Sequence, residues 1–187
     1  MSRTSLTHPL RIDAHPLAAG TLGLTFCPGK HGDSLTGDPW ARDLDTDLAA
    51  IKAWGADLVV TLMQRHEFDL LHVPDLPERV RALGMDWSHL PIRDVDIPAA
   101  PFDSLWDAVR SDILIRLAAG GRVVLHCRGG LGRTGLVAAL LLMESGMNAE
   151  NAILAVRKVR PGAIETDAQE HYVFGYRPRG DQLAGNG

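Results

Sequence analysis

Cysteine is scarce in this chain of 187 residues, where Cys27 and Cys127 are the two thiols. Two cysteines cannot supply the disulfide framework of a small secreted domain, so a reducing, cytoplasmic compartment fits the sequence best. The histidines show no metal-ligand spacing, and Cys27 with His31 has no second pair of ligands to complete a zinc site. We therefore expect no metal and no organic cofactor.

Long hydrophobic runs are also missing. The longest, Leu136 to Met143, is far shorter than the roughly 20 residues that span a bilayer, and residues 1–9 lack the apolar core of a signal peptide. The formal net charge is −4, so the chain has no overall basic footprint for nucleic acid. We expect a monomer, with neither stable membrane insertion nor a nucleic-acid partner.

Length and periodic patterns predict a single α/β domain. The apolar fraction of 45% can support a sizeable core over residues 10–176, whereas residues 1–9 and 177–187 are expected to be flexible. Predicted strands and helices alternate, which indicates a central twisted, mainly parallel sheet flanked by helices. The strands are expected over 10–14, 21–26, 58–63, 85–92 and 122–126. The helices are expected over 44–55, 76–83, 102–117, 135–144 and 149–158, and after residue 166.

One segment concentrates residues that can do chemistry. It reads His126-Cys127-Arg128-Gly129-Gly130-Leu131-Gly132-Arg133-Thr134-Gly135. An apolar strand precedes it and an apolar helix follows it, so the cysteine is expected at the carboxyl end of a strand, where ligands of α/β sheets bind. A cysteine followed six positions later by an arginine suits a nucleophilic thiolate with a phosphate cradle.

The residue types explain that interpretation. A helix N-terminus and inward-facing backbone N–H groups favour a thiolate and form a nest for an anion. Glycines tolerate the positive φ angles that a tight loop requires, and Arg133 can bond two phosphoryl oxygens at once. Thr134 places a hydroxyl beside the sulfur. The predicted phosphate-binding residues are Arg128, Gly129, Gly130, Leu131, Gly132 and Arg133. A buried structural cysteine and a binding loop without turnover are the alternatives.

The segment resembles the signature of cysteine-dependent protein tyrosine phosphatases. Within that superfamily the chain is most similar to the kinase-associated phosphatase group of dual-specificity enzymes. The similarity also covers 20–25, 55–62, 89–94 and 162–166. It implies a phosphatase domain over residues 10–176 and phosphomonoester hydrolysis (the EC 3.1.3 class) through a phosphocysteine on Cys127.

Cleavage of a phosphate ester requires a proton for the leaving oxygen. Asp94 follows a predicted strand and matches the family's acid in its Pro-Ile-x-Asp context, while Asp96 is the alternative. Related enzymes also use a glutamine to position water for the second step. Here Glu165 replaces the first glutamine of that motif and Gln169 is retained, so Gln169 is a candidate for positioning the water, with a solvated helix-start glutamine as the alternative.

The resemblance implies a phosphorylated protein as the substrate, and the family name suggests a kinase among such partners. The matching motifs concern catalysis and core rather than a docking surface. A phosphoinositide phosphatase, a sulfur-transfer enzyme and a catalytically silent phosphoprotein-binding module remain the alternative functions. The combination of Cys127, Arg133 and Asp94 favours the phosphatase.

Overall fold

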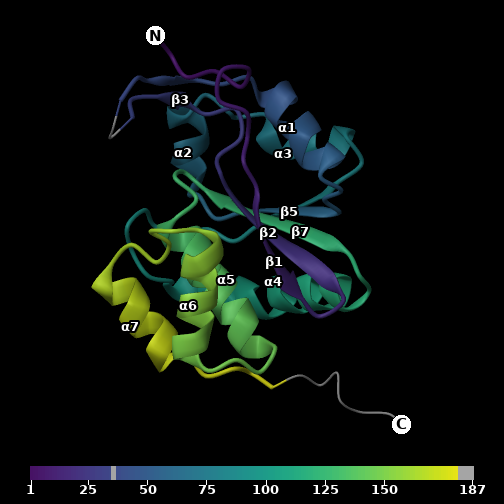
Figure 1. Ribbon diagram of the computed structural model, residues 1–187, viewed down its shortest axis with the longest axis vertical. Helices are drawn as coiled ribbons and strands as arrows, with labels where there is room; N and C mark the ends of the chain where they lie inside the picture. The colour runs from purple at the N-terminus through teal and green to yellow at the C-terminus, as the bar shows by residue number, and fades with distance from the viewer. Residues whose placement is uncertain (35–36, 181–187) are drawn as a thin grey trace.

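A five-stranded sheet organises the molecule, and the computed structural model describes residues 1–34 and 37–180 (Figure 1). Its strands are β1 Asp13–Leu17, β2 Gly20–Phe26, β5 Leu58–Thr61, β6 Asp86–His89 and β7 Arg122–Cys127. They lie in the order β1-β2-β7-β5-β6. The edge strand β1 is antiparallel to β2, and the other neighbours are parallel. The prediction of a single α/β domain around a mainly parallel sheet is confirmed.

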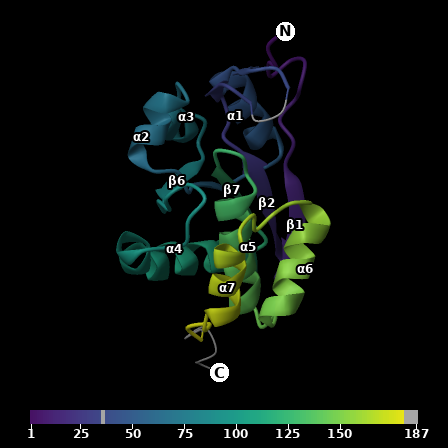
Figure 2. The same cartoon turned by 90° about the vertical axis from the view of Figure 1, so that its left-hand side faces the viewer.

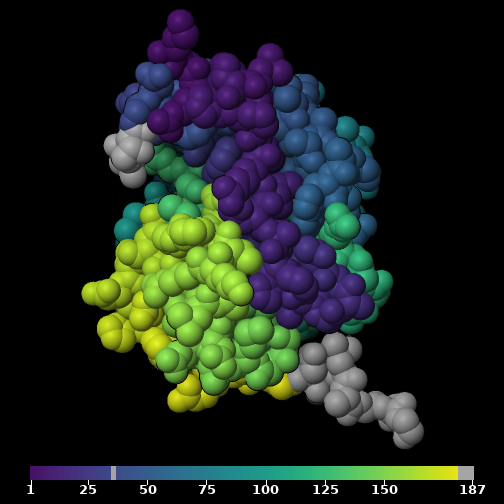
Figure 3. Space-filling model, in the orientation of Figure 1, coloured from purple at the N-terminus to yellow at the C-terminus, as the bar shows by residue number. Residues whose placement is uncertain are grey.

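Helices cover both faces of this sheet, as the two ribbon views show (Figures 1 and 2). One side carries α1 Leu44–Ala53, α2 Arg65–Leu70 and α3 Leu76–Ala82. The other side carries α4 Ala100–Ala118, α5 Gly132–Glu144, α6 Ala149–Val159 and α7 Asp167–Gly175. A small two-stranded sheet of β3 His31–Gly32 and β4 Trp40–Ala41 lies on the α1 side. In the space-filling view, the purple N-terminal region runs down one face between the blue and the green helical regions (Figure 3).

Helix α5 lies at the centre of the core because its sequence is apolar almost throughout. Every one of its residues from Gly132 to Met143 is buried, and it packs against β2, β7, α6 and α7. Strand β5 is fully buried, as is β7 from Val123 onward. Burial on both faces is typical of parallel strands covered by helices on each side. The loop that joins β7 to α5 is therefore anchored at both ends in the core.

The helix caps confirm two local predictions. The Asn148 side chain accepts a hydrogen bond from the Asn151 amide at 2.8 Å, and Thr166 accepts one from the Gln169 amide at 3.1 Å. Such caps satisfy backbone donors that a helix leaves unpaired at its start. Helix α5 begins at Gly132, three residues before the predicted start, so Arg133 and Thr134 belong to its first turn.

The predicted first strand, 10–14, is misplaced. The observed strand β1 spans Asp13–Leu17 and pairs with β2 through a tight turn in which Ala18 has a φ of 54°. Pro16 misled the sequence interpretation because proline usually interrupts a strand. It is tolerated here because β1 is an edge strand and needs no amide donor on its open side. The strands β5 and β6 are also shorter than predicted, and α2 is missing from the prediction.

Contacts with the body of the domain are present near both ends of the described chain. Near the N-terminus, predicted to be flexible, the Arg3 amide donates to the Pro39 carbonyl at 2.8 Å and the Arg3 carbonyl accepts from Ala41 at 3.0 Å. In the predicted tail, Arg179 pairs with Asp107 at 2.7 Å, and residues 181–187 lie outside the described residues. None of the helices in the described part of the chain has the length and apolar character of a membrane span.

Candidate active site

The carboxyl ends of three parallel strands meet around Cys127. In the sheet register, Cys127 lies opposite Phe26 of β2, and the preceding His126 lies opposite Thr61 of β5. The Cys127 side chain is 3% exposed. The loop after β6 and the first turn of α5 complete the surroundings, since Asp94 and Arg133 contact each other there. The prediction that Cys127 lies at the carboxyl edge of the sheet is therefore confirmed.

A backbone amide of the loop bonds the sulfur. The Gly130 amide donates to Cys127 Sγ at 3.2 Å. Gly130 has a φ of +70°, and a Cβ there would overlap the backbone of Thr25 and Phe26, so glycine is required. The other two glycines of the loop, Gly129 and Gly132, do not use this freedom, because neither has a positive φ.

Arg160 holds the loop from its outer side. Its Nε donates to the Gly130 carbonyl at 2.6 Å and its Nη2 donates to the Gly129 carbonyl at 3.2 Å. Its Nη1 is paired with Asp13 of β1 at 2.7 Å. Because the Gly129 carbonyl is bonded outward, the Gly130 amide of the same peptide is free to face the sulfur. Arg160 adjoins a Pro-Gly break in the sequence, and nothing local in the sequence indicates this role.

Arg133 is almost completely buried and holds four contacts through its two terminal nitrogens. Nη1 donates to Glu67 Oε2 at 2.6 Å and to the Ile92 carbonyl at 3.1 Å. Nη2 donates to Glu67 Oε1 at 2.9 Å and to Asp94 Oδ1 at 2.7 Å. Burial alone would lower the pKa of Arg133, but the bonds to Glu67 and the nearby negative charges raise it above its usual value. Nε has no partner among the described residues.

Glu67 is a site residue that the sequence analysis missed. It lies on α2, and its Oε2 also accepts from the Gln64 amide at 2.7 Å, which caps that helix. The spacing of Gln64 and Glu67 is that of a capping box, the one local signal that could have revealed α2. The contact with Arg133 spans 66 residues and has no local signature.

The structure separates the two candidate acids. Asp94 bonds Arg133, while the Asp96 carboxylate lies 3.6 Å from the exposed Arg93 and accepts from the Ile97 amide. Between them, Val95 has a φ of 60°, a strained conformation for a β-branched residue. This turn directs Asp94 toward the loop and the Asp96 carboxylate elsewhere.

Gln169 is fully buried, so the alternative of a solvated glutamine is wrong. Its Nε2 donates to the Asp96 carbonyl at 3.1 Å, and its Oε1 accepts from the Glu165 amide at 2.9 Å. Glu165 in turn accepts from the Gly132 amide at 2.8 Å. A Cβ on Gly132 would come within 2.5 Å of the Glu165 carboxylate and 2.9 Å of the Gln169 amide, so both side chains would have to shift to accept a larger residue there.

The remaining predicted residues lie on the same loop. Thr134 is buried, and its hydroxyl has no partner among the described residues. Arg128 is partly buried, and its carbonyl accepts from the Cys27 amide at 3.3 Å. The Leu131 carbonyl accepts from the Ile164 amide at 3.3 Å, which ties the loop to the segment before α7.

His126 supports the strand beneath the loop. Its Nε2 lies 2.7 Å from Thr61 Oγ1, which also accepts from Trp87 Nε1 at 2.9 Å. Complete burial lowers the pKa of His126 to about 3, so the ring is neutral at physiological pH. The geometry agrees with a scaffold role and not with a general base.

Known proteins resemble this chain in both sequence and fold. Residues 41–173 match the family model described as Swiss Army Knife protein, DSP-PTPase phosphatase domain. The chain is 30% identical over 182 residues to cyclin-dependent kinase inhibitor 3 of Mus musculus, covering 94% of this chain and 81% of that protein. It is 31% identical over 145 residues to protein tyrosine phosphatase type IVA 3 of Homo sapiens, covering 78% of each. A solved kinase associated phosphatase, with its catalytic cysteine changed to serine, superposes with a TM-score of 0.78 at 27% identity, covering 88% of this chain and 92% of that one.

Proposed function

The chain belongs to the dual-specificity phosphatase family, and from this premise we propose that it hydrolyses phosphate monoesters through a covalent phosphocysteine on Cys127. One observation carries the proposal. The Gly130 amide bonds the Cys127 sulfur at 3.2 Å, and in the adjoining first turn of α5 Arg133 bonds Asp94 at 2.7 Å. A nucleophile and an anion-binding guanidinium from the segment 126–135, together with an acid from the loop after β6, support the proposal.

In the first step, the Cys127 thiolate attacks phosphorus, and the bond to the leaving oxygen breaks with its electron pair on that oxygen. Arg133 binds two phosphoryl oxygens through Nε and through Nη2, on which the phosphate takes the position of Asp94. Backbone N–H groups of residues 128–132 bind the remaining charge, which spreads over the equatorial oxygens, and on the Gly132 amide the phosphate takes the position of Glu165. Asp94 donates its proton to the leaving oxygen.

In the second step, water attacks phosphorus and the phosphorus–sulfur bond breaks, so the electron pair returns to Cys127. Asp94, now a carboxylate, takes the proton of the water. The Thr134 hydroxyl, which has no other partner among the described residues, donates to the departing sulfur. Gln169 is the candidate for positioning the water. Its Nε2 and Oε1 are bonded to the Asp96 carbonyl and the Glu165 amide, so this role requires one of these contacts to open.

We propose a phosphorylated protein as the substrate, with a kinase among the candidates. The names of two relatives, cyclin-dependent kinase inhibitor 3 and kinase associated phosphatase, support this choice. Asp94→Ala is the variant for a substrate screen, because it keeps the cradle and slows release of the leaving group. We expect it to retain phosphopeptides in preference to phosphoinositide vesicles. Retention of the vesicles alone would refute a protein substrate.

Cys127→Ser tests the mechanism itself. This variant is expected to keep its thermal midpoint and to lose turnover of an aryl phosphate. Surviving turnover would refute a thiolate nucleophile.

Both cysteines are free thiols, and the mechanism requires Cys127 to stay reduced, so we propose that the enzyme works in a reducing, cytoplasmic compartment. We also propose that it works as a monomer. Elution as a dimer in size-exclusion chromatography would contradict the monomer.

A further inference from the structure

Lys30 carries a positive charge that is buried next to the loop of Cys127. The side chain is 8% exposed, and its Nζ donates to the Arg128 carbonyl at 3.2 Å. The rings of Phe26 and Trp40 lie against the ammonium, with centroids 4.5 and 4.6 Å from Nζ. Two aromatic faces and one loop carbonyl therefore hold the charge in place.

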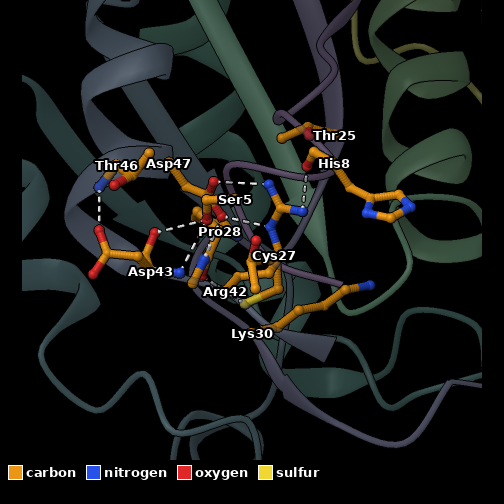
Figure 4. Close-up of polar contacts among 12 residues, drawn as sticks. Ser5, His8, Thr25, Cys27, Pro28, Lys30, Arg42, Asp43, Thr46 and Asp47 are labelled. Carbon is orange, nitrogen blue, oxygen red and sulfur yellow. Dashed lines mark hydrogen bonds and ion pairs between the residues drawn. The ribbon is translucent and has the colours of Figure 1, made fainter. Parts of the chain in front are cut away.

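The backbone around Lys30 is fixed by a buried ion pair (Figure 4). Asp47 of α1 bonds Arg42 at 2.7 and 2.8 Å and also accepts from the Gly29 amide at 2.8 Å. The Arg42 amide donates to the Lys30 carbonyl at 3.2 Å. Because the Asp47 carboxylate is committed to these partners, it does not serve as the counter-ion of Lys30.

A buried ammonium is costly unless an opposite charge lies nearby. Within the described residues, no carboxylate forms an ion pair with Lys30. Burial lowers the pKa of Lys30 to about 8, the sulfurs of Cys27 and Cys127 oppose this shift, and the charges of Arg42 and Arg128 add to it. The Arg128 carbonyl that Nζ contacts adjoins Cys127 in the chain, so the ammonium lies beside the loop that carries this sulfur.

Only one of these sulfurs is suited to carry a negative charge. Cys27 is fully buried, and burial raises its pKa far above that of a free cysteine. Its thiol donates to the Pro28 carbonyl at 3.4 Å. Cys27 therefore keeps its proton, whereas Cys127 accepts a hydrogen bond from the Gly130 amide, a contact that favours a thiolate.

We propose that the Lys30 ammonium is the counter-ion of the Cys127 thiolate, held at the side of the loop that the Arg128 carbonyl faces. The inference rests on the proposed nucleophile and adds a residue from outside the cysteine-to-arginine segment. Lys30 acts through the sulfur and not on the phosphate, so it is a positioning residue. The attraction is mutual, because each charge favours the ionised form of the other.

The first test measures alkylation of Cys127 by iodoacetamide at about pH 6, where a free thiol is almost wholly protonated. Lys30→Met keeps the apolar stem and removes the charge, and we expect alkylation to slow on the order of tenfold. Lys30→Arg keeps a charge and is expected to stay within about threefold of the wild type. Lys52→Met is the matched control, because Lys52 is exposed and bonds only the Gly84 carbonyl. Equal rates in folded Lys30→Met and wild type would overturn the proposal.

The second test does not require a variant at Lys30. The chain has three lysines, Lys30, Lys52 and Lys158, so their side-chain carbon resonances can be followed separately in an NMR titration. Cys127→Ser removes the anionic sulfur, and the midpoint of Lys30 is expected to fall while those of Lys52 and Lys158 stay in place. An unchanged Lys30 midpoint would contradict the counter-ion even if Lys30→Met failed to fold.

The two proposals fail differently. If Cys127→Ser still turned over an aryl phosphate, the proposed function would be refuted. Suppose instead that Cys127→Ser were inactive, but Lys30→Met did not slow alkylation of Cys127 and Cys127→Ser did not shift the Lys30 midpoint. The proposed nucleophile would then stand, and the proposed role of Lys30 would be refuted.

Discussion

Glu67 binds both terminal nitrogens of Arg133, with contacts of 2.6 and 2.9 Å between side chains that are almost fully buried. The pair joins helix α2 on one side of the sheet to helix α5 on the other. A further bond from Arg133 to the Ile92 carbonyl fixes the plane of the guanidinium. The direction in which Arg133 presents Nε and Nη2 is therefore set by protein contacts.

Glu67→Gln is expected to lower kcat/KM for an aryl phosphate by about 10- to 100-fold, since bonds to charged groups are each worth about 1.5–3 kcal/mol. The amide retains the size of the side chain but cannot accept through two oxygens. Steady-state kinetics would measure this loss. Asp69→Asn, at an exposed position on the same helix, is the control, and an equal effect of both exchanges would contradict the role of Glu67.

Asp94→Asn is expected to slow turnover by about 10²- to 10⁴-fold, because the amide cannot protonate the leaving oxygen. The loss should shrink for aryl phosphates whose leaving group is a weak base. Asp96→Asn is the matched control, since its carboxylate lies near Arg93 rather than Arg133. A large effect of Asp96→Asn together with a small effect of Asp94→Asn would reverse the assignment.

Arg160→Lys is expected to weaken both activity and folding. Lysine cannot bond two loop carbonyls and Asp13 in one planar arrangement, so at least one contact is lost. We expect the unfolding free energy to fall by about 1–3 kcal/mol and kcat/KM to fall with it. Urea unfolding and kinetics would show this, with the exposed Arg177→Lys as reference. Normal kinetics in Arg160→Lys would mean that the loop keeps its shape without the contacts of the Arg160 guanidinium.

His126 is expected to make folding stability depend on pH. Its pKa is lowered from 6.5 to about 3 by burial, so between these values the unfolded chain takes up a proton that the folded chain excludes. Its contribution to stability is complete above about pH 6.5 and is lost as pH falls toward 3, by about 1.4 kcal/mol per pH unit. Denaturant unfolding of wild type and His126→Gln across this range isolates the effect. Parallel slopes would contradict it, and the exposed His171→Gln is the control.

The sequence predicts the β7–loop–α5 region well because its signals are local. An apolar strand, three glycines and an apolar helix follow one another without a gap, and the spacing from Cys127 to Arg133 is short. The caps at Asn148 and Thr166 are local too, since a side chain bonds an amide three positions ahead. Interactions of this range can be interpreted from the order of residues alone.

The supports of the site are not predictable in the same way. Glu67 reaches Arg133 across 66 positions, and Arg160 reaches Asp13 across 147 positions. A buried acid and a buried base resemble ordinary surface charges in the sequence, because their burial is decided by how helices pack. The misplaced first strand has the same origin, since only the sheet order shows that Pro16 lies at an edge.

Gln169 has a consequence for control from a distance. Its single amide group connects helix α7 to the Asp96 carbonyl, two residues beyond the proposed proton donor. We therefore expect a displacement of α7 to be transmitted to the turn that carries Asp94, at a distance from the Cys127 sulfur.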